Sequence, residues 1–153
     1  LVAATGMTFI EAKAFIDEYN KVRVKLVDYT KSIIKQAHEA GYVETLYGRR
    51  RPTPDVSSSN FAVRNAAERA AANMPIQGTE ADLMKKAMVV LDEKIAGLGE
   101  QLLQVHDSIL VECRKENADK IAEILQDTME NIAPDLGVKL QIDVHVGDNW
   151  GEV

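Results

Sequence analysis

The sequence has only one cysteine, Cys113, and lacks any apolar run long enough to cross a bilayer. A single thiol cannot form a disulfide within the chain, so we expect no disulfide framework and a reducing, cytoplasmic setting. A membrane span needs roughly 20 consecutive apolar residues. No leader of the charged-then-apolar secretory type opens the sequence either. We therefore expect no membrane partner.

What is present is typical of a globular protein. Hydrophobic residues make up 46% of the 153 residues and charged residues 27%, a balance that does not favour disorder. This length can bury one sizeable core. The first residue is Leu1 rather than methionine, and the sequence opens directly into a pattern typical of the middle of a domain. We therefore expect a fragment or a processed piece of a longer protein.

The charge distribution is more informative than the formal net charge of −6, which by itself argues weakly against a nucleic-acid partner. Residues 21–69 hold ten Lys/Arg against five Asp/Glu, whereas the rest of the chain holds eight against nineteen. A basic middle in an acidic chain fits a strip that faces phosphates, but it also fits a solvated helix face beside a basic turn. Charge alone leaves both interpretations open.

Helical patterns dominate the first part of the chain. Thr8 and Glu11 have the spacing of a capping box, which predicts a helix start. Apolar residues then recur every three or four positions over two helical stretches, and Gly41 is a natural stop for the second. The members of the two stretches are Ala12, Phe15, Ile16 and Tyr19, followed by Leu26, Tyr29, Ile33, Ile34 and Ala37.

The next part mixes short extended segments with further helices. We predict a strand over 42–46, a turn at Gly48 and a loop over 52–59, which contains two prolines and three serines. A helix is predicted over 60–73 and another over 76–96, because Pro75 cannot donate to a helix ladder and should interrupt the pattern. Gly97 and Gly99 should end the second of these helices.

The last part predicts a small sheet. Two β-prone runs, 101–105 and 109–113, flank His106-Asp107-Ser108 and predict a hairpin with buried strands. An amphipathic helix is predicted over 116–131, and strict alternation over 140–146 predicts a half-buried strand. The fold class is therefore predicted to be α+β, with several helices packed on a small antiparallel sheet.

Asp107 is the residue most suggestive of chemistry. An aspartate in a hairpin link is commonly a turn former, because Asp tolerates tight backbone geometry. A carboxylate held at such a tip is also well placed to bind a hard cation such as Mg²⁺. Phosphoryl transfer with two metals needs at least a pair of acids, and no second motif in the chain clearly supplies one. Both interpretations of Asp107 stay open on the local sequence.

Four blocks of the sequence resemble segments of family A, polymerase I-type DNA polymerases. Their order along the chain and the intervals between them also fit this family, and the resemblance covers essentially the whole chain. Gln104-Val105-His106-Asp107 resembles the third polymerase motif, and the ending 144–150 resembles the final palm strand and tail. The segment 41–51, Gly-Tyr-Val-Glu-Thr-Leu-Tyr-Gly-Arg-Arg-Arg, resembles the connection between fingers and palm. Another family segment is matched by Arg64, Ala67-Glu68-Arg69, Asn73 and Pro75-Ile76-Gln77-Gly78.

This resemblance implies a fold, a reaction and a set of partners. The chain would be the fingers-to-palm part of a polymerase catalytic domain, a single fragment over 1–153. Residues from 1 to about 96 would be the mainly helical connection of fingers and palm, and residues from about 97 to 153 the palm sheet and helix. The parent would extend primer-template DNA with deoxynucleoside triphosphates, using two Mg²⁺ ions. An upstream polymerase segment would supply the other metal-binding aspartate and the nucleotide-binding fingers helix.

The resemblance also implies roles for individual residues. Asp107 would be a catalytic carboxylate that binds metal, and His106 would lie near the primer terminus. A second group would contact DNA: Arg69, Asn73 and Gln77 at the minor groove near the new base pair, and Arg51 at the backbone. Donors of this kind suit a copying enzyme, because every base pair presents acceptors at equivalent minor-groove positions. Their spacing of four would place the three on one helical face, only approximately so if Pro75 distorts it.

Departures from the family pattern and structural alternatives remain. Ser108 stands where family members often carry an acid, which puts an auxiliary carboxylate in doubt but not Asp107. Asn20 and Val24 stand where the family often has an aromatic residue and a proline, so a break between the first two helices is less certain. Asn73 could instead be a helix C-cap and Gln77 a capping amide, and Arg49–Arg51 could be a solvated turn. The competing functions are a non-catalytic nucleic-acid-binding module and a plain structural or interaction domain.

Overall fold

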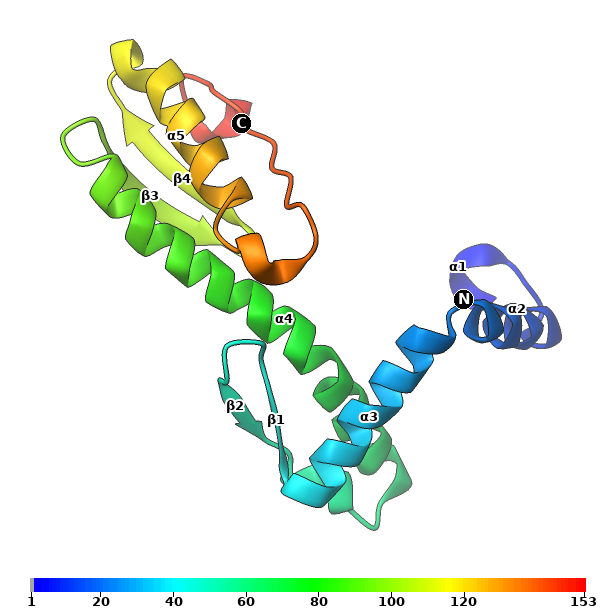
Figure 1. Cartoon of the computed structure of the whole chain (residues 1–153). Coiled ribbons are helices and arrows are strands. Elements are labelled where there is room, and N and C mark those ends of the chain that lie inside the picture. The colour runs from blue at the N-terminus through cyan, green and yellow to red at the C-terminus, as the bar shows by residue number, and fades with distance from the viewer. Residues whose placement is uncertain (1) are drawn as a thin grey trace. The chain divides into compact units, whose positions relative to one another are not determined.

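The computed structural model describes residues 2–153, which form two compact units that divide between Ile76 and Gln77 (Figure 1). The first unit holds α1 (Val2–Thr5), α2 (Phe9–Val22), α3 (Val24–Ala40), β1 (Tyr42–Glu44), β2 (Arg50–Pro52) and the 3-10 turn η1 (Pro54–Ser57). Helix α4 (Phe61–Lys94) begins in the first unit and ends in the second. The second unit continues with β3 (Gly99–Val105), β4 (Ser108–Cys113) and α5 (Ala118–Glu130). No helix among residues 2–153 has the length and apolar content that a membrane crossing demands.

The predicted capping box starts α2. The backbone N–H of Thr8 donates to Glu11 Oε2 at 2.8 Å, and the N–H of Glu11 donates to Thr8 Oγ1 at 3.3 Å. The backbone bond and then the bond from the Thr8 hydroxyl lower the pKa of Glu11 below its ordinary value. A depressed carboxyl pKa means that this cap stabilises the helix above the ordinary pKa, and the contribution disappears as the pH falls through the lowered one.

Helix α3 ends as predicted at Gly41, whose φ of 75° is a left-handed C-cap. The chain then turns into β1, which pairs antiparallel with β2. Thr53 connects the segment after β2 to the end of α3. Its N–H donates to Gly41 O at 2.9 Å, and its hydroxyl donates to Ala37 O at 3.2 Å. The prediction of a loop over 52–59 is wrong at Pro52, which ends β2, and at the 3-10 turn η1. Its prolines and serines indicated a turn but could not show that Arg50–Pro52 has a pairing partner.

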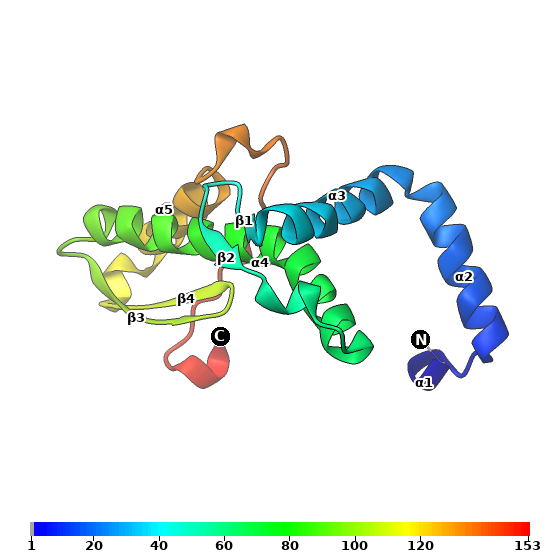
Figure 2. The ribbon, with the colours of Figure 1, turned by 90° about the horizontal axis from the view of Figure 1, so that it is seen from below.

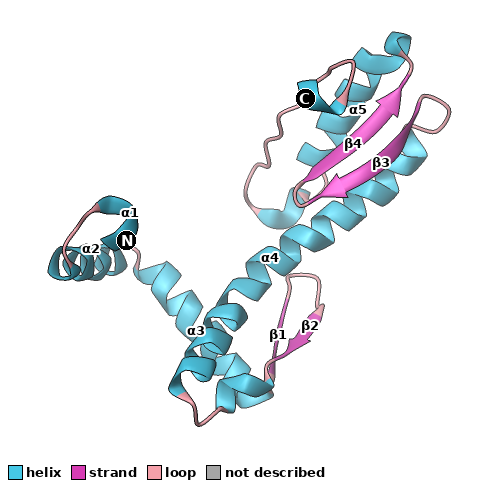
Figure 3. Cartoon of the chain, turned by 180° about the vertical axis from the view of Figure 1, so that it is seen from behind, coloured by secondary structure: helices cyan, strands magenta, loops and turns pink. Residues whose placement is uncertain are grey.

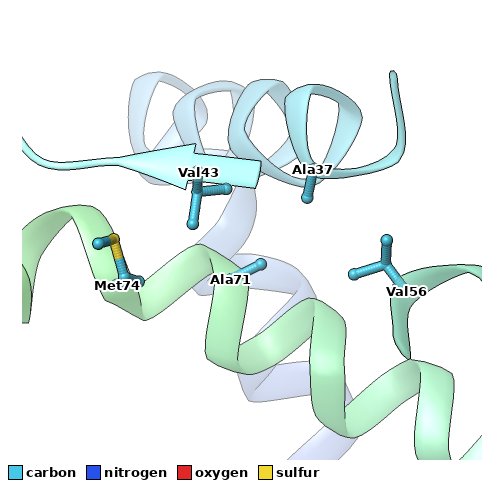
Figure 4. Packing of buried hydrophobic residues seen from close by; sticks show 5 residues of the cluster. All are labelled: Ala37, Val43, Val56, Ala71 and Met74. Carbon is cyan, nitrogen blue, oxygen red and sulfur yellow. The ribbon is translucent and has the colours of Figure 1, made fainter. Parts of the chain in front are cut away.

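The core of the first unit is small and lies between α3, β1, η1 and the start of α4. Its fully or nearly buried members are Ala37, Val43, Val56, Ala71 and Met74, and Figure 4 shows how their side chains converge. Helix α2 contributes little to any core. Only Ala12 on this helix is buried, while Phe9 is 76% and Ile10 80% exposed.

The predicted break at Pro75 is wrong, because α4 continues through it as one helix of 34 residues. A proline inside a helix removes one ladder bond and costs about 3 kcal/mol. Here Pro75 is buried, and the segments on both sides pack independently. Ala71 and Met74 lie in the core of the first unit, and Leu83 and Ala87 in that of the second. Tertiary packing therefore outweighs the local penalty.

The second unit places the hairpin β3–β4 beside α4 and α5, as Figures 1 and 2 both show. Its core joins α4 to the segment after α5 and contains Leu83, Ala87, Ile132 and Ala133, with Ile109 and Met129 packed against it. Two side-chain amides connect the elements. Gln101 Nε2 donates to Met88 O at 2.9 Å, and Asn117 Nδ2 donates to Leu98 O at 2.9 Å. The α+β class is thereby confirmed, with two small antiparallel sheets in place of one.

No strand forms over 140–146, contrary to prediction. Figure 3 draws this stretch as loop, and the only secondary structure described beyond it is the 3-10 turn η4 (Trp150–Glu152), so 144–150 forms no final palm strand. The alternation itself is present, since Leu140, Ile142 and Val144 are half-buried while Gln141 and Asp143 are exposed. A strand needs a hydrogen-bonded neighbour as well as an alternating pattern. Within residues 2–153 this segment has the pattern alone.

Candidate functional site

Asp107 lies at the tip of the β3–β4 hairpin. Val105 pairs with Ser108 in the antiparallel register, so the connecting loop is only His106 and Asp107. The hairpin is confirmed, and its link is one residue shorter than predicted. A two-residue loop tightly constrains the backbone on both sides, so it carries Asp107 at a defined place relative to the strands.

The Asp107 side chain is exposed and makes no hydrogen bond or ion pair with any residue of the described chain. Its carboxylate oxygens are therefore available to an external cation. The expectation that both flanking strands are buried is wrong. Leu102, Leu103 and Val105 of β3 are 43–49% exposed, and β4 is at most partly buried. The end of β3 nearest the turn lacks a covering element among residues 2–153.

Two side chains brace the turn, and sequence reasoning missed both of them. Ser108 Oγ donates to Val105 O at 2.8 Å, and Gln104 Nε2 donates to the backbone carbonyl of His106. His106 itself adopts a φ of 53°, in the left-handed region. The available signal was the absence of glycine from so short a loop, since a residue with a side chain must then take the strained position.

Helix α4 carries three of the residues predicted to bind DNA. Arg69, Asn73 and Gln77 are spaced four apart in this helix, and all three are exposed with no bonded side-chain partner in residues 2–153. Because α4 continues beyond both positions, Asn73 is not a C-cap and Gln77 caps no helix end. Arg69 and Asn73 belong to the first compact unit and Gln77 to the second. The neighbouring acid Glu68 is held by His38 at 2.9 Å, so it is not committed to Arg69.

Arg50 and Arg51, two neighbours in strand β2, differ in their contacts. Arg50 pairs across the sheet with Glu44, Nε to Oε2 at 3.2 Å, and stacks over the Tyr42 ring at 4.4 Å. Arg51, the next residue in β2, is exposed with no ion pair in the described chain. It lines a groove of about 400 Å³ together with Asp55 and alanines of α4. Arg51, unlike Arg50, is therefore free to contact a phosphate.

The described residues offer one candidate metal ligand, Asp107, but no complete metal site. Nowhere in 2–153 do three or more His, Cys, Asp or Glu side chains gather in a way that could hold an ion. Asp107 fits one part of a Mg²⁺ site, because its hard oxygen donors are exposed and not neutralised by a neighbouring cation. Further ligands would have to come from elsewhere, such as substrate phosphates or another protein segment.

Comparison with known proteins shows where this arrangement belongs. Residues 1–152 match the sequence profile described as DNA polymerase family A. The chain belongs to this family. It is 44% identical over 146 residues to the thermostable DNA polymerase I of Thermus aquaticus, an alignment that covers 95% of this chain and 17% of the relative. DNA polymerase I of Deinococcus radiodurans is also 44% identical, over 95% of this chain and 15% of its own length.

A solved structure confirms the fold. The polymerase domain of Pol1 from M. smegmatis, determined with DNA primer-template and dNTP, superposes with a TM-score of 0.80 at 39% identity. The match covers 86% of this chain and 24% of that one. Of the DNA polymerases I of Thermus aquaticus and Deinococcus radiodurans, the chain spans less than a fifth of the length.

Proposed function

We propose that this chain is part of a DNA-directed DNA polymerase that extends a primer 3′-hydroxyl with deoxynucleoside triphosphates by two-metal phosphoryl transfer. Membership of family A supports the reaction class. The observation that carries the assignment within this chain is Asp107, an exposed and unpartnered carboxylate on a tightly braced hairpin turn. Primer-template DNA and the incoming nucleotide are the proposed partners, by similarity to the M. smegmatis complex.

Asp107 would hold the proposed Mg²⁺ together with a carboxylate from a polymerase segment outside these residues. When bound, the ions would stabilise negative charge on the reacting phosphate and activate the attacking hydroxyl. The contribution of Asp107 is a fixed negative charge at the hairpin tip. His106 would lie beside it, next to the primer terminus.

Helix α4 would supply the contacts to the duplex. The side chains of Arg69, Asn73 and Gln77 all offer N–H donors, and none is used by another side chain of the described residues. Minor-groove acceptors occupy equivalent positions in every correct base pair, so such donors test the shape of a pair without reading its sequence. Arg51 would bind a phosphate of the backbone.

We predict that the isolated 153-residue chain incorporates no nucleotide. One carboxylate cannot by itself hold the two cations that the reaction needs. The measurement is single-nucleotide extension of a labelled primer with Mg²⁺ and all four deoxynucleoside triphosphates. Extension that is abolished by Asp107→Ala would show that the chain is catalytically complete, contrary to the proposal.

The second candidate is a nucleic-acid-binding module without catalysis, in which Asp107 is only a turn residue. It is favoured by the free donors on α4 and by Arg51, which need no metal. The coding sequence upstream of Leu1 discriminates the two. An open frame encoding a palm strand with an aspartate and a fingers helix with a lysine supports the polymerase, whereas a stop codon followed by a start site next to Leu1 supports the module.

Both candidates predict salt-dependent duplex binding, and Arg51 gives the sharpest test. Each phosphate contact contributes about 0.9 to the slope of log Kobs against log salt, so Arg51→Ala should reduce that slope by about one. Arg50→Ala is the matched control, because the Arg50 guanidinium is already occupied by Glu44 and Tyr42. Fluorescence anisotropy on a labelled duplex at several salt concentrations gives the slope. Equal slopes for the two variants would remove Arg51 from the interface.

A further inference from the structure

The turn that carries Asp107 is strained in an uncommon way. Two-residue hairpin loops need a positive φ at the first central residue, which glycine or asparagine normally provides. Here that residue is His106 at φ 53°, the only non-glycine residue with positive φ among those described. A side chain makes this conformation less favourable than it is for glycine, so other interactions must hold the turn.

Side-chain packing does not hold it. Every residue from Leu102 to Ser108 is exposed, and the hairpin tip touches neither described core cluster. What remains, beyond the strand ladder, is the pair of hydrogen bonds from Ser108 Oγ to Val105 O and from Gln104 Nε2 to His106 O. One donor, Gln104, precedes the two-residue loop and the other, Ser108, directly follows it.

We propose that Ser108 is a positioning residue for Asp107. Its hydroxyl, bonded to Val105 O, keeps the loop in the one conformation that presents the Asp107 carboxylate to a divalent cation. The proposal rests on the proposed metal-binding role of Asp107. The Ser108 hydroxyl is directed to the backbone, so its contribution is geometric.

The physical benefit is pre-organisation. A cation that binds a mobile carboxylate must also immobilise the loop, and this ordering cost reduces the affinity. A loop that is already fixed avoids that cost, so removal of the Ser108 bond should weaken cation binding without removing a ligand. One hydrogen bond contributes about 0.5–1.5 kcal/mol, equivalent to about two- to tenfold in cation affinity.

The test uses the 153-residue chain in solution and needs no catalysis. In Ser108→Ala, ¹⁵N relaxation should show larger fast motion of the His106 and Asp107 amides than in the unmodified chain. Mn²⁺ serves as the cation probe, and line broadening of the Asp107 amide per unit of Mn²⁺ should fall about two- to tenfold. Ser108→Thr keeps the hydroxyl and suits a strand position, so it should restore both values.

Ser32→Ala is the matched control. Ser32 is an exposed residue of helix α3 whose Oγ donates to Tyr29 O at 2.7 Å, so this variant loses an equivalent bond far along the chain from the turn. It should leave the relaxation and the broadening at Asp107 unchanged. Unchanged values in Ser108→Ala, or no recovery in Ser108→Thr, would overturn the positioning role.

Asp107→Asn separates this inference from the proposed function. If Mn²⁺ broadens the turn equally with and without the Asp107 carboxylate, the proposed metal role fails, and the positioning of Asp107 for a cation fails with it. If Asp107→Asn removes the broadening while Ser108→Ala leaves it unchanged, the metal role stands and the positioning role alone is wrong.

Discussion

Asp107→Asn is expected to lower the turnover of the complete polymerase by about a thousandfold or more. The amide keeps the size and the turn-forming ability of the side chain but removes the negative charge that we propose binds the cation. Charge stabilisation by a catalytic metal is worth several kcal/mol, and each 1.36 kcal/mol of barrier is tenfold in rate. Single-turnover incorporation at saturating nucleotide measures the change.

A matched variant makes this result specific. Asp92→Asn removes the same charge from another exposed aspartate, which lies on α4 and has no bonded partner in residues 2–153. We expect its turnover to stay close to that of the unmodified enzyme. A loss of less than about tenfold in Asp107→Asn would return Asp107 to the role of a turn former.

Gly99→Ala is expected to have the largest effect on stability, lowering the free energy of unfolding by about 1–3 kcal/mol, as overpacking typically does. A Cβ at this position would lie 2.6 Å from Ile121 Cδ1 and 2.7 Å from Glu112 O. The Ile121 methyl can rotate away, but Glu112 O belongs to the backbone of the paired strand β4. Relief therefore requires β3 and β4 to separate where the hairpin packs on α5. Urea denaturation of the purified chain gives the free energy.

Gly97→Asn controls for the loss of a glycine as such. Gly97 has a φ of 75°, and a Cβ there would meet no atom within 4 Å. Asparagine tolerates the left-handed conformation, so we expect a change within about 0.5 kcal/mol. Similar losses in Gly97→Asn and Gly99→Ala would show that backbone conformation, rather than the close contact of β3 with β4 and α5, determines the effect.

Features set by neighbouring residues could be predicted from the sequence. The Thr8–Glu11 capping box and the left-handed stop at Gly41 each depend on a few consecutive residues, and both are confirmed. The hairpin around Asp107 was likewise predicted from two β-prone runs and a short polar link. The predicted positions of the DNA-binding residues depend on family resemblance, and their roles stay predictions.

Features set by distant partners could not be predicted. Strand β2 exists because Arg50–Pro52 finds Tyr42–Glu44, and the alternating segment 140–146 forms no strand because no described neighbour pairs with it. A proline usually interrupts a helix, and the break predicted at Pro75 rests on that average effect. In this chain the neighbours of Pro75 are packed in the two cores, and α4 continues through it. The bracing of the Asp107 turn escaped prediction for a related reason, since the targets of the Gln104 and Ser108 side chains are backbone carbonyls, which no residue pattern reveals.

The two-stranded sheets have a practical consequence for work with the purified chain. In the part of the chain that is described, each strand pairs with one other strand only, and the exposed end of β3 can offer the backbone groups of its other edge to a neighbouring molecule. Charge protects β2 through Arg50 and Arg51, but Leu102-Leu103-Gln104-Val105 in β3 is uncharged and largely apolar. Such an edge promotes aggregation as the concentration rises. Dilute samples should therefore favour a monodisperse chain, whereas added salt would screen the repulsion that comes from the net charge of −6.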